Sequence, residues 1–195
     1  MKGDPEPMIT GKKVLLREFR AEDLPAIQAW VNNPRIRKHL AFSVYPQTLE
    51  GSRAYLERQL QGQEGNVTFV IALRDDPEQK YIGSVGLHNI DRLHRHAEIG
   101  ITLAREDLFG KGLGGEATYL ICAFAFLRLG LHKVNLRCFA YNERGLACYR
   151  RAGFREAGRL REDHFYNGAF HDDVLMDLLA SEFLAAHPEA FGLFE

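Results

Sequence analysis

The sequence predicts an α/β protein built on a single mixed, mostly antiparallel sheet, with one parallel βαβ crossover and helices on both faces. The expected elements follow the order β-α-α-β-β-β-α-β-α-β-β, which is neither a pure meander nor a regular βα repeat. A strand ending at Leu103, a helix from Glu116 and a strand from Lys133 can form a right-handed parallel crossover. Two strand-like runs flank Asn167-Gly168, a dipeptide typical of tight hairpins.

The N-terminal half predicts a strand, two helices and a three-stranded meander, at residues 14–18, 22–32, 48–60, 67–73, 81–90 and 96–103. The first helix carries Leu24, Ile27 and Trp30 on one face, and Pro34 is expected to end it. The second helix is weakened by Gly51. The segments "RDDPEQ" and "DRLHR" are turns between the three strands.

The C-terminal half predicts the crossover helix, a strand, a short helix and the hairpin, at residues 116–129, 133–140, 144–152, 155–165 and 170–179. Gly130 ends the apolar helix, and Gly153 closes the short one. The strand at 133–140 alternates apolar and polar residues. Residues 181–187 are expected to form a last helical turn.

Composition indicates one soluble domain over residues 1–195, with a core at about 13–179 and short extensions. Hydrophobic residues make up 46% and charged residues 26%. Lys+Arg (25) and Asp+Glu (26) nearly cancel, so neither a nucleic-acid nor a membrane partner is expected. The first residues resemble no signal peptide, and the apolar run at 120–127 is far shorter than the ~20 residues that span a bilayer. A cytoplasmic location is therefore expected.

The most informative stretch is "FGKGLGGEA", residues 109–117, which precedes the apolar helix. A P-loop is excluded because Lys111 is followed by Gly112 rather than Ser or Thr. Gly110, Gly112 and Gly115 have the spacing of a dinucleotide fingerprint. However, no acidic residue follows about 20 residues later to bind the ribose.

A third ligand for this stretch is a pyrophosphate held by backbone amides at a helix start. Coenzyme A carries such a diphosphate, and this interpretation needs no metal. Basic residues available nearby are Lys111, Arg105, Arg144, Arg150 and Arg151. A flexible glycine turn ahead of a helix is the alternative without a ligand.

Four segments occur together in one order: "HAEIGITL", "LFGKGLGGEA", "HKVNLRCFAYNERGLACYRRAGF" and "DHFYNGAFHDD". Taken together they resemble the GNAT superfamily of N-acetyltransferases, and within it the RimJ/RimL-like branch of ribosomal-protein N-terminal and spermidine acetyltransferases. The resemblance runs from about residue 13 to 179 and is most specific over 97–154. It implies the GNAT fold, acetyl-CoA as co-substrate and transfer of the acetyl group to an amine.

The resemblance also implies roles for individual positions. The family's Q/R-x-x-G-x-G/A signature falls on Phe109, Gly112 and Gly114, and Phe109 departs from it. Pantetheine is expected to pair with the main chain of the strand before the loop. The implied cofactor-binding residues are Ile101, Thr102, Leu103, Phe109, Gly110, Lys111, Gly112, Leu113, Gly114, Gly115, Asn142 and Arg144. Tyr149 matches the tyrosine that often protonates the departing thiolate.

A base is expected because a lysine-like amine is almost fully protonated at pH 7. Glu98, on the strand nearest the acetyl group, is the first choice, and His88 and Asp91 are weaker alternatives. His94 and His96 alternate like metal ligands, and "HDD" at 171–173 also suggests a metal. Surface strand residues explain both better, so no metal is assigned. The cysteines, Cys122, Cys138 and Cys148, are expected to be reduced thiols.

The acceptor is a small-molecule or peptide amine that the sequence does not name. An apolar wall is expected from Trp30, Phe42, Tyr45, Phe165 and Tyr166, and Glu162 and Asp163 could attract a cation. The hairpin around Asn167-Gly168 is expected to help form a homodimer. A non-catalytic acyl-CoA-binding or sensing module on the same fold is the alternative function, and a nucleotide-dependent oxidoreductase is disfavoured by the missing acidic residue.

Overall fold

The computed structural model describes residues 8–40 and 45–194. Within them an 8-stranded sheet runs in the order β1-β2-β3-β4-β5-β6-β8-β7. The strands are Ile9–Thr10 (β1), Val14–Arg17 (β2), Val67–Leu73 (β3), Gly83–Asp91 (β4), His96–Leu103 (β5), Lys133–Phe139 (β6), Arg155–Tyr166 (β7) and Ala169–Leu179 (β8). Of the neighbouring pairs in the described sheet, β5 with β6 alone is parallel. The predicted fold class is confirmed.

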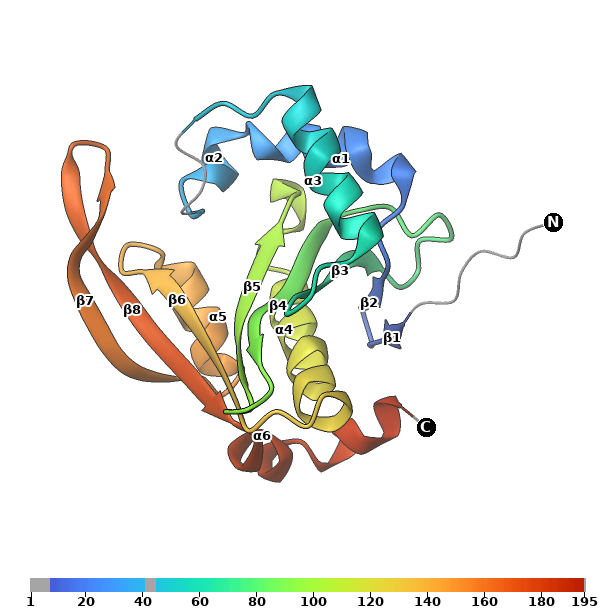
Figure 1. The fold of residues 1–195 in the computed structure, drawn as a ribbon, viewed down its shortest axis with the longest axis vertical. Coiled ribbons are helices and arrows are strands. Elements are labelled where there is room, and N and C mark those ends of the chain that lie inside the picture. The colour runs from blue at the N-terminus through green and yellow to red at the C-terminus, as the bar shows by residue number, and fades with distance from the viewer. Residues whose placement is uncertain (1–7, 41–44, 195) are drawn as a thin grey trace.

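Helices cover both faces of this sheet, as Figure 1 shows. One face carries α1 (Leu24–Val31), α2 (Pro34–Arg37) and α3 (Leu49–Gln61). The other face carries α4 (Leu113–Ala123) and α5 (Glu143–Arg151). The chain ends with α6 (Ala180–Ala186) and a 3-10 turn, Pro188–Leu193, with two further 3-10 turns at Ala21–Asp23 and Glu106–Leu108.

The hydrophobic core lies in two clusters, one on each face. The larger packs α4 on the sheet through residues such as Leu120, Val134 and Met176, and it reaches Ile9 and Phe183, beyond the expected 13–179 core. The smaller packs α1 and α3 on β3 and includes Trp30, Leu56 and Val70. Apolar burial of this kind is worth about 25 cal/mol per Å2, so both layers are held mainly by it.

The parallel pair opens along its length. β5 and β6 are paired only from His96↔Lys133 to Glu98↔Asn135. Beyond that point β5 stays paired with β4 as far as Leu103, and β6 stays paired with β8 as far as Phe139. Figure 1 shows the two strands diverging toward the end beneath α1–α3. Within residues 8–40 and 45–194, the inner edges of both strands therefore have no strand partner there, and this opening positions the site.

Several element boundaries differ from the sequence predictions. The crossover helix begins at Leu113, three residues early, because Gly112 takes a left-handed φ of 82° and ends the loop there. Its last turn, Phe124–Arg128, is π-helical. Pro34 begins α2 instead of only ending the previous helix, because Asn33 caps it by accepting a hydrogen bond from the Arg35 amide.

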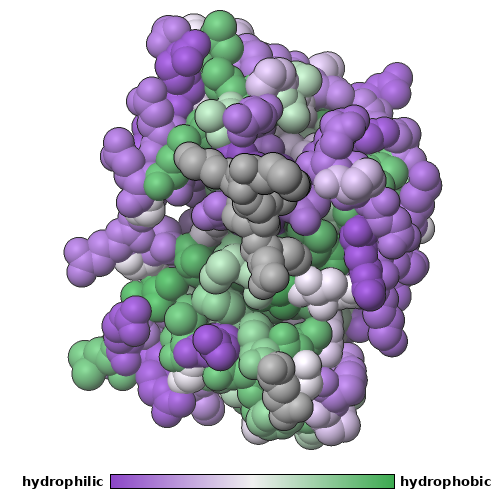
Figure 2. Space-filling view, turned by 90° about the vertical axis from the view of Figure 1, so that its right-hand side faces the viewer, coloured by the Kyte–Doolittle hydropathy of each residue, from purple (hydrophilic) through white to green (hydrophobic). Residues whose placement is uncertain are grey.

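The face that carries β1 is shown in Figure 2, where hydrophilic residues cover most of the upper part and hydrophobic residues gather below. The C-terminal segment packs there by aromatic contacts, with the Phe183 and Tyr119 rings 5.6 Å apart. Among the described residues, none of the helices has the length and apolar character needed to cross a bilayer.

Candidate active site

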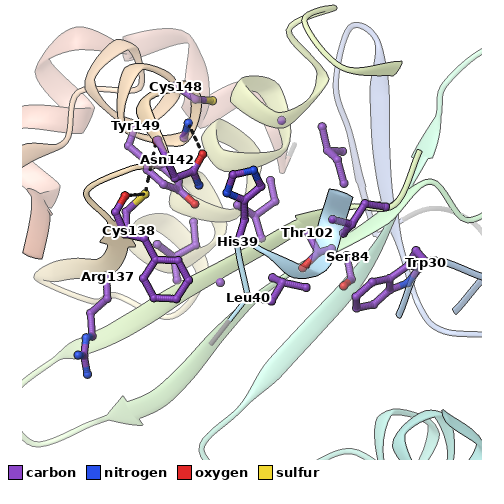
Figure 3. A pocket seen from close by; sticks show the side chains of 18 of the residues that line it. Trp30, His39, Leu40, Ser84, Thr102, Arg137, Cys138, Asn142, Cys148 and Tyr149 are labelled. Carbon is purple, nitrogen blue, oxygen red and sulfur yellow. Dashed lines mark hydrogen bonds between the residues drawn. The ribbon is translucent and has the colours of Figure 1, made fainter. Parts of the chain in front are cut away.

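A cavity of about 1260 Å3 occupies the opening between β5 and β6. Its floor is the face of β4 and β5 that carries Ser84, Glu98 and Thr102. One wall comes from α1 and α3, and the opposite wall from β6, β7 and β8. Figure 3 shows Tyr149, Asn142 and Cys148 on one side, Ser84, Thr102 and Trp30 on the other, and His39 and Leu40 between them.

The glycine loop forms the end of the cavity nearest α4. Gly110 and Gly112 have φ values of 77° and 82°, which glycine alone adopts readily. Among the described residues, no side chain caps α4 at Gly112. The amides of its first turn, residues 113–115, have no intrahelical acceptor and carry the positive end of the helix dipole. This end of the cavity is therefore built to receive an anion.

The expected basic residues divide into two groups. Arg144 and Arg151 line the cavity. Arg105 forms an ion pair with Asp107, and Arg150 one with Glu156, and neither arginine lines the cavity. The Lys111 side chain also lies outside the lining, although its carbonyl accepts a hydrogen bond from Lys13 Nζ at 3.2 Å.

The other predicted cofactor-binding residues all line the cavity: Ile101, Thr102, Leu103, Phe109, Gly110, Gly112, Leu113, Gly114, Gly115, Asn142 and Arg144. Asn142 is also the N-cap of α5, because its Oδ1 accepts a hydrogen bond from the Gly145 amide at 3.1 Å. The sequence contained a signal for this cap, because asparagine is one of the residues preferred at the N-cap of a helix. The cap sets the orientation of α5 and hence of Tyr149.

Tyr149 lines the cavity from α5, with its ring 6.0 Å from Phe154. Burial raises the pKa of the Tyr149 hydroxyl well above its usual value. Burial likewise raises the pKa of the Cys148 thiol, and that of Cys138 to about 11, so both thiols stay protonated at neutral pH. The three cysteines are free, as the sequence predicted.

The floor brings together two of the base candidates. Glu98 and His88 are paired across β5 and β4, and both line the cavity. Burial lowers the pKa of His88, and the nearby Glu98 charge opposes this shift. Asp91 and His96 are the next pair along, at the turn between the two strands; their side chains approach to 3.9 Å and do not line the cavity.

The wall opposite α3 is charged. Arg137 on β6 contacts both Asp163 on β7 and Asp173 on β8, the latter at 2.8 Å. Asp163 is aimed there by a bulge in β7, at which Glu162 has a φ of 55°. The second oxygen of Asp173, Oδ1, is buried and has no hydrogen-bond partner in the part of the chain that the structure describes. Glu162 itself does not line the cavity.

Among the described residues, no group of three or more His, Cys, Asp or Glu side chains is arranged to hold a metal ion. The rings of His94 and His96 stack on the surface turn with their centroids 6.4 Å apart. The His171 ring packs edge-on against Tyr141, with the two centroids 4.9 Å apart.

The prediction of an apolar wall made of five aromatic residues is mostly wrong. Trp30 lines the cavity, but Tyr45, Phe165 and Tyr166 are exposed and lie outside the lining, and Phe42 lies outside the described residues. Trp30 Nε1 donates a hydrogen bond to the Tyr81 hydroxyl at 3.1 Å.

The sequence also missed polar lining residues from distant segments, namely His39, Tyr55, Arg58, Thr68, Ser84 and Arg137. No local motif marks these residues, because sheet pairing and helix packing bring them together.

The chain resembles known acetyltransferases over most of its length. Residues 13–155 match the family model described as acetyltransferase (GNAT) domain. Spermidine N(1)-acetyltransferase of Escherichia coli (strain K12) is 29% identical over 180 residues, covering 92% of this chain and 93% of that protein. YdaF of Bacillus subtilis (strain 168), provisionally named a ribosomal N-acetyltransferase, is 38% identical over 100 residues, 51% of this chain and 54% of that one. The structure of spermidine N-acetyltransferase from Vibrio cholerae with CoA and spermine superposes with a TM-score of 0.78 at 27% identity, covering 88% of this chain and 98% of that one.

Proposed function

This chain belongs to the GNAT acetyltransferase family, and we propose that it transfers the acetyl group of acetyl-CoA to a primary amine by direct attack of the amine on the thioester. The observation that carries the proposal is the opening between β5 and β6, with an anion-binding helix start at one end and Glu98 on its floor. Membership of this family makes the protein an enzyme, which sets aside the alternative of a non-catalytic binding module.

Acetyl-CoA fits this opening in three respects. The diphosphate can be bound by the amides of residues 113–115. The pantetheine arm can hydrogen-bond to the unpaired edge of β5 at Ile101, Thr102 and Leu103. The cavity, at about 1260 Å3, exceeds the 300–1,000 Å3 typical of a site for one small ligand, which leaves room for an acceptor beside the cofactor.

Tyr149 is proposed to assist departure of the thiolate. A thiol of pKa about 8.5 is a stronger acid than a phenol of pKa about 10, so full proton transfer from tyrosine is uphill by about 2 kcal/mol at ordinary values. Burial raises the pKa of Tyr149, which keeps the hydroxyl protonated as a hydrogen-bond donor. We therefore assign Tyr149 the stabilisation of the departing sulfur, mainly by hydrogen bonding.

The acceptor is proposed to be a cationic amine, either a small polyamine-like molecule or a peptide N-terminus. The Glu98 carboxylate on the cavity floor can accept a hydrogen bond from an ammonium group. The charge of Asp163 is largely neutralised by Arg137. Relatives named as spermidine acetyltransferases support a small amine.

A homodimer through the β7–β8 hairpin remains part of the proposal. Phe165 and Phe170 at its tip are 59% and 63% exposed, with ring centroids 5.0 Å apart. Exposed aromatic pairs of this kind favour protein contacts. Light scattering over a range of concentrations would contradict the dimer if the mass stayed that of a monomer.

The decisive experiment measures thiol release from acetyl-CoA in the presence of a panel of amines: spermidine, spermine, simple diamines and peptides with free N-termini. We expect release that depends on one class of amine and an acetylated product of matching mass. Thermal stabilisation by CoA but not by NAD is the accompanying binding test. Absence of both CoA binding and amine-dependent release would refute the proposal.

A further inference from the structure

His88 lies across the floor of the cavity where the parallel pair opens. It stands on β4 opposite Glu98 of β5, and both side chains line the cavity. The imidazole extends over Gly100, because a Cβ added to Gly100 would lie 3.2 Å from His88 Nε2 and 3.3 Å from Cδ2. The absence of a side chain at position 100 therefore leaves room for the ring. It puts Nε2 above β5 just past Glu98, the last residue paired with β6.

The imidazole is available for a ligand. Among the described residues it has no hydrogen-bond partner, and its pKa responds only to burial, which lowers it, and to the charge of Glu98, which raises it. The balance is a pKa below the ordinary value, so His88 is neutral at pH 7. A neutral, unpartnered imidazole beside the reaction path can accept a proton.

The charged and titratable groups around His88 come from each neighbouring element. Its cross-strand neighbour is Glu98, which forms no ion pair with another described residue. Across the cavity, α3 presents Tyr55 and Arg58. The wall opposite presents Arg137 with its two carboxylates, Asp163 and Asp173. On β3 the lining residue is the uncharged Thr68.

We propose that His88 is the base that deprotonates the acceptor amine and that Glu98 is its counter-charge; this rests on the function proposed above. His88 Nε2 takes one proton from the acceptor ammonium and becomes imidazolium beside the Glu98 carboxylate. The free amine attacks the acetyl carbonyl, the C–N bond forms and the C–S bond breaks. The second proton lost from nitrogen balances the proton that the thiolate gains, and His88 returns its own proton to solvent.

The chemistry favours imidazole for this task. An ordinary imidazole is more basic than an ordinary carboxylate by about two pKa units, so it takes a proton from an ammonium group less unfavourably. Glu98 is placed to stabilise the imidazolium as it forms. Glu98 is thus a positioning and electrostatic residue, and His88 is the catalytic one.

The test compares His88→Gln and Glu98→Gln with His96→Gln. His96 lies on the neighbouring strand, 3.9 Å from Asp91, and does not line the cavity. With an acceptor amine of high pKa, His88→Gln should lower kcat/KM at pH 7 about 100-fold. The affinity for CoA and the unfolding midpoint should stay unchanged, and His96→Gln should match the wild type.

The pH profile distinguishes a base from a structural residue. Wild-type kcat/KM should rise with pH and level off above an apparent pKa below 6.5. His88→Gln should keep rising tenfold per pH unit up to the pKa of the amine, because only the free amine then reacts. In Glu98→Gln the rise of kcat/KM should occur at lower pH than in the wild type, since the charge that raises the pKa of His88 is gone. Its plateau should also fall.

Two results would overturn the proposal. One is a His88→Gln profile that rises and levels off at the same pH as the wild type. The other is a Glu98→Gln profile that no longer levels off at low pH, which would make Glu98 the base. An acceptor amine of low pKa provides a further check. With such an amine, which is already largely neutral at pH 7, the ratio of wild-type to His88→Gln kcat/KM should approach one. If the wild-type protein binds CoA but acetylates no amine in the panel, the proposed function fails first, and the role of His88 fails with it.

Discussion

The guanidinium of Arg144 lies over the ring of Phe109, 4.0 Å from its centroid. Phe109 occupies the position where the family's cofactor signature usually has glutamine or arginine, and Arg144 lies in the first turn of α5. The two side chains together place a positive charge beside the glycine loop, although the signature residue is apolar. Both line the cavity close to the start of α4.

Phe109→Ala should therefore weaken CoA binding, because Arg144 loses the ring that orients it. A cation–π contact at an exposed site is worth about 0.5–1 kcal/mol, which corresponds to a two- to fivefold rise in Kd. Isothermal titration calorimetry with CoA measures this directly. Phe109→Tyr keeps the ring and should bind like the wild type, and equal affinity for the alanine variant would exclude the role of the stack.

Tyr149→Phe should lower kcat about 10- to 100-fold with little change in the Kd for acetyl-CoA, because it removes the hydroxyl that we propose stabilises the departing sulfur. The variant leaves the ring packed against Phe154. Steady-state kinetics and calorimetry together separate the two effects. Unchanged turnover would remove Tyr149 from the mechanism.

The raised pKa of Tyr149 also predicts the alkaline side of the pH profile. A hydroxyl pKa above its usual value of about 10 means that the protonated donor persists to higher pH. Activity should therefore not fall as the pH passes from 9 through 10. A decline with an apparent pKa near 10, absent in Tyr149→Phe, would show that Tyr149 titrates as an ordinary exposed tyrosine.

Tyr141 connects the two sides of the cavity, because its hydroxyl donates a hydrogen bond to the Lys38 carbonyl at 2.5 Å. The adjacent His39 and Leu40 line the cavity. Tyr141→Phe should raise KM for one or both substrates about fivefold, which is the value of a hydrogen bond of about 1 kcal/mol, while kcat stays within twofold. Initial rates over both substrate concentrations test this, and an unaltered KM would show that the bond does not order this segment.

Asp23→Asn should destabilise the whole fold. Arg17 and Asp23 form a bidentate pair, with side chains only 3% and 5% exposed, and Asp23 also accepts a hydrogen bond from the Arg20 amide. Removing the Asp23 charge leaves the Arg17 charge buried without a counter-charge, although Arg17 still donates hydrogen bonds to the Glu18 and Gln79 carbonyls. Breaking a buried pair in this way costs about 3–5 kcal/mol of unfolding free energy. Urea denaturation measures the loss. Glu50→Gln, which removes the exposed partner of Arg53, is the control and should change little.

The order of elements could be predicted from the sequence because its signals are local. Asn167-Gly168 specifies a tight turn through the left-handed φ values of both residues, 51° and 82°. The glycines at 110 and 112 likewise mark a helix start that no side chain caps among the described residues. The residues expected at the cofactor came from the same local segments, and all but Lys111 line the cavity.

By itself, then, the sequence determined the order of the strands and helices and the glycine loop ahead of α4, since each depends on backbone preferences within a few residues. Only the tertiary structure decided where β5 and β6 separate, because the pairing past Glu98 depends on how β4 and β8 hold the two outer edges. It also decided which side chains from distant segments line the cavity. His88, Tyr55 and Arg137 belong to three separate elements, and long-range packing alone brings them to one cavity.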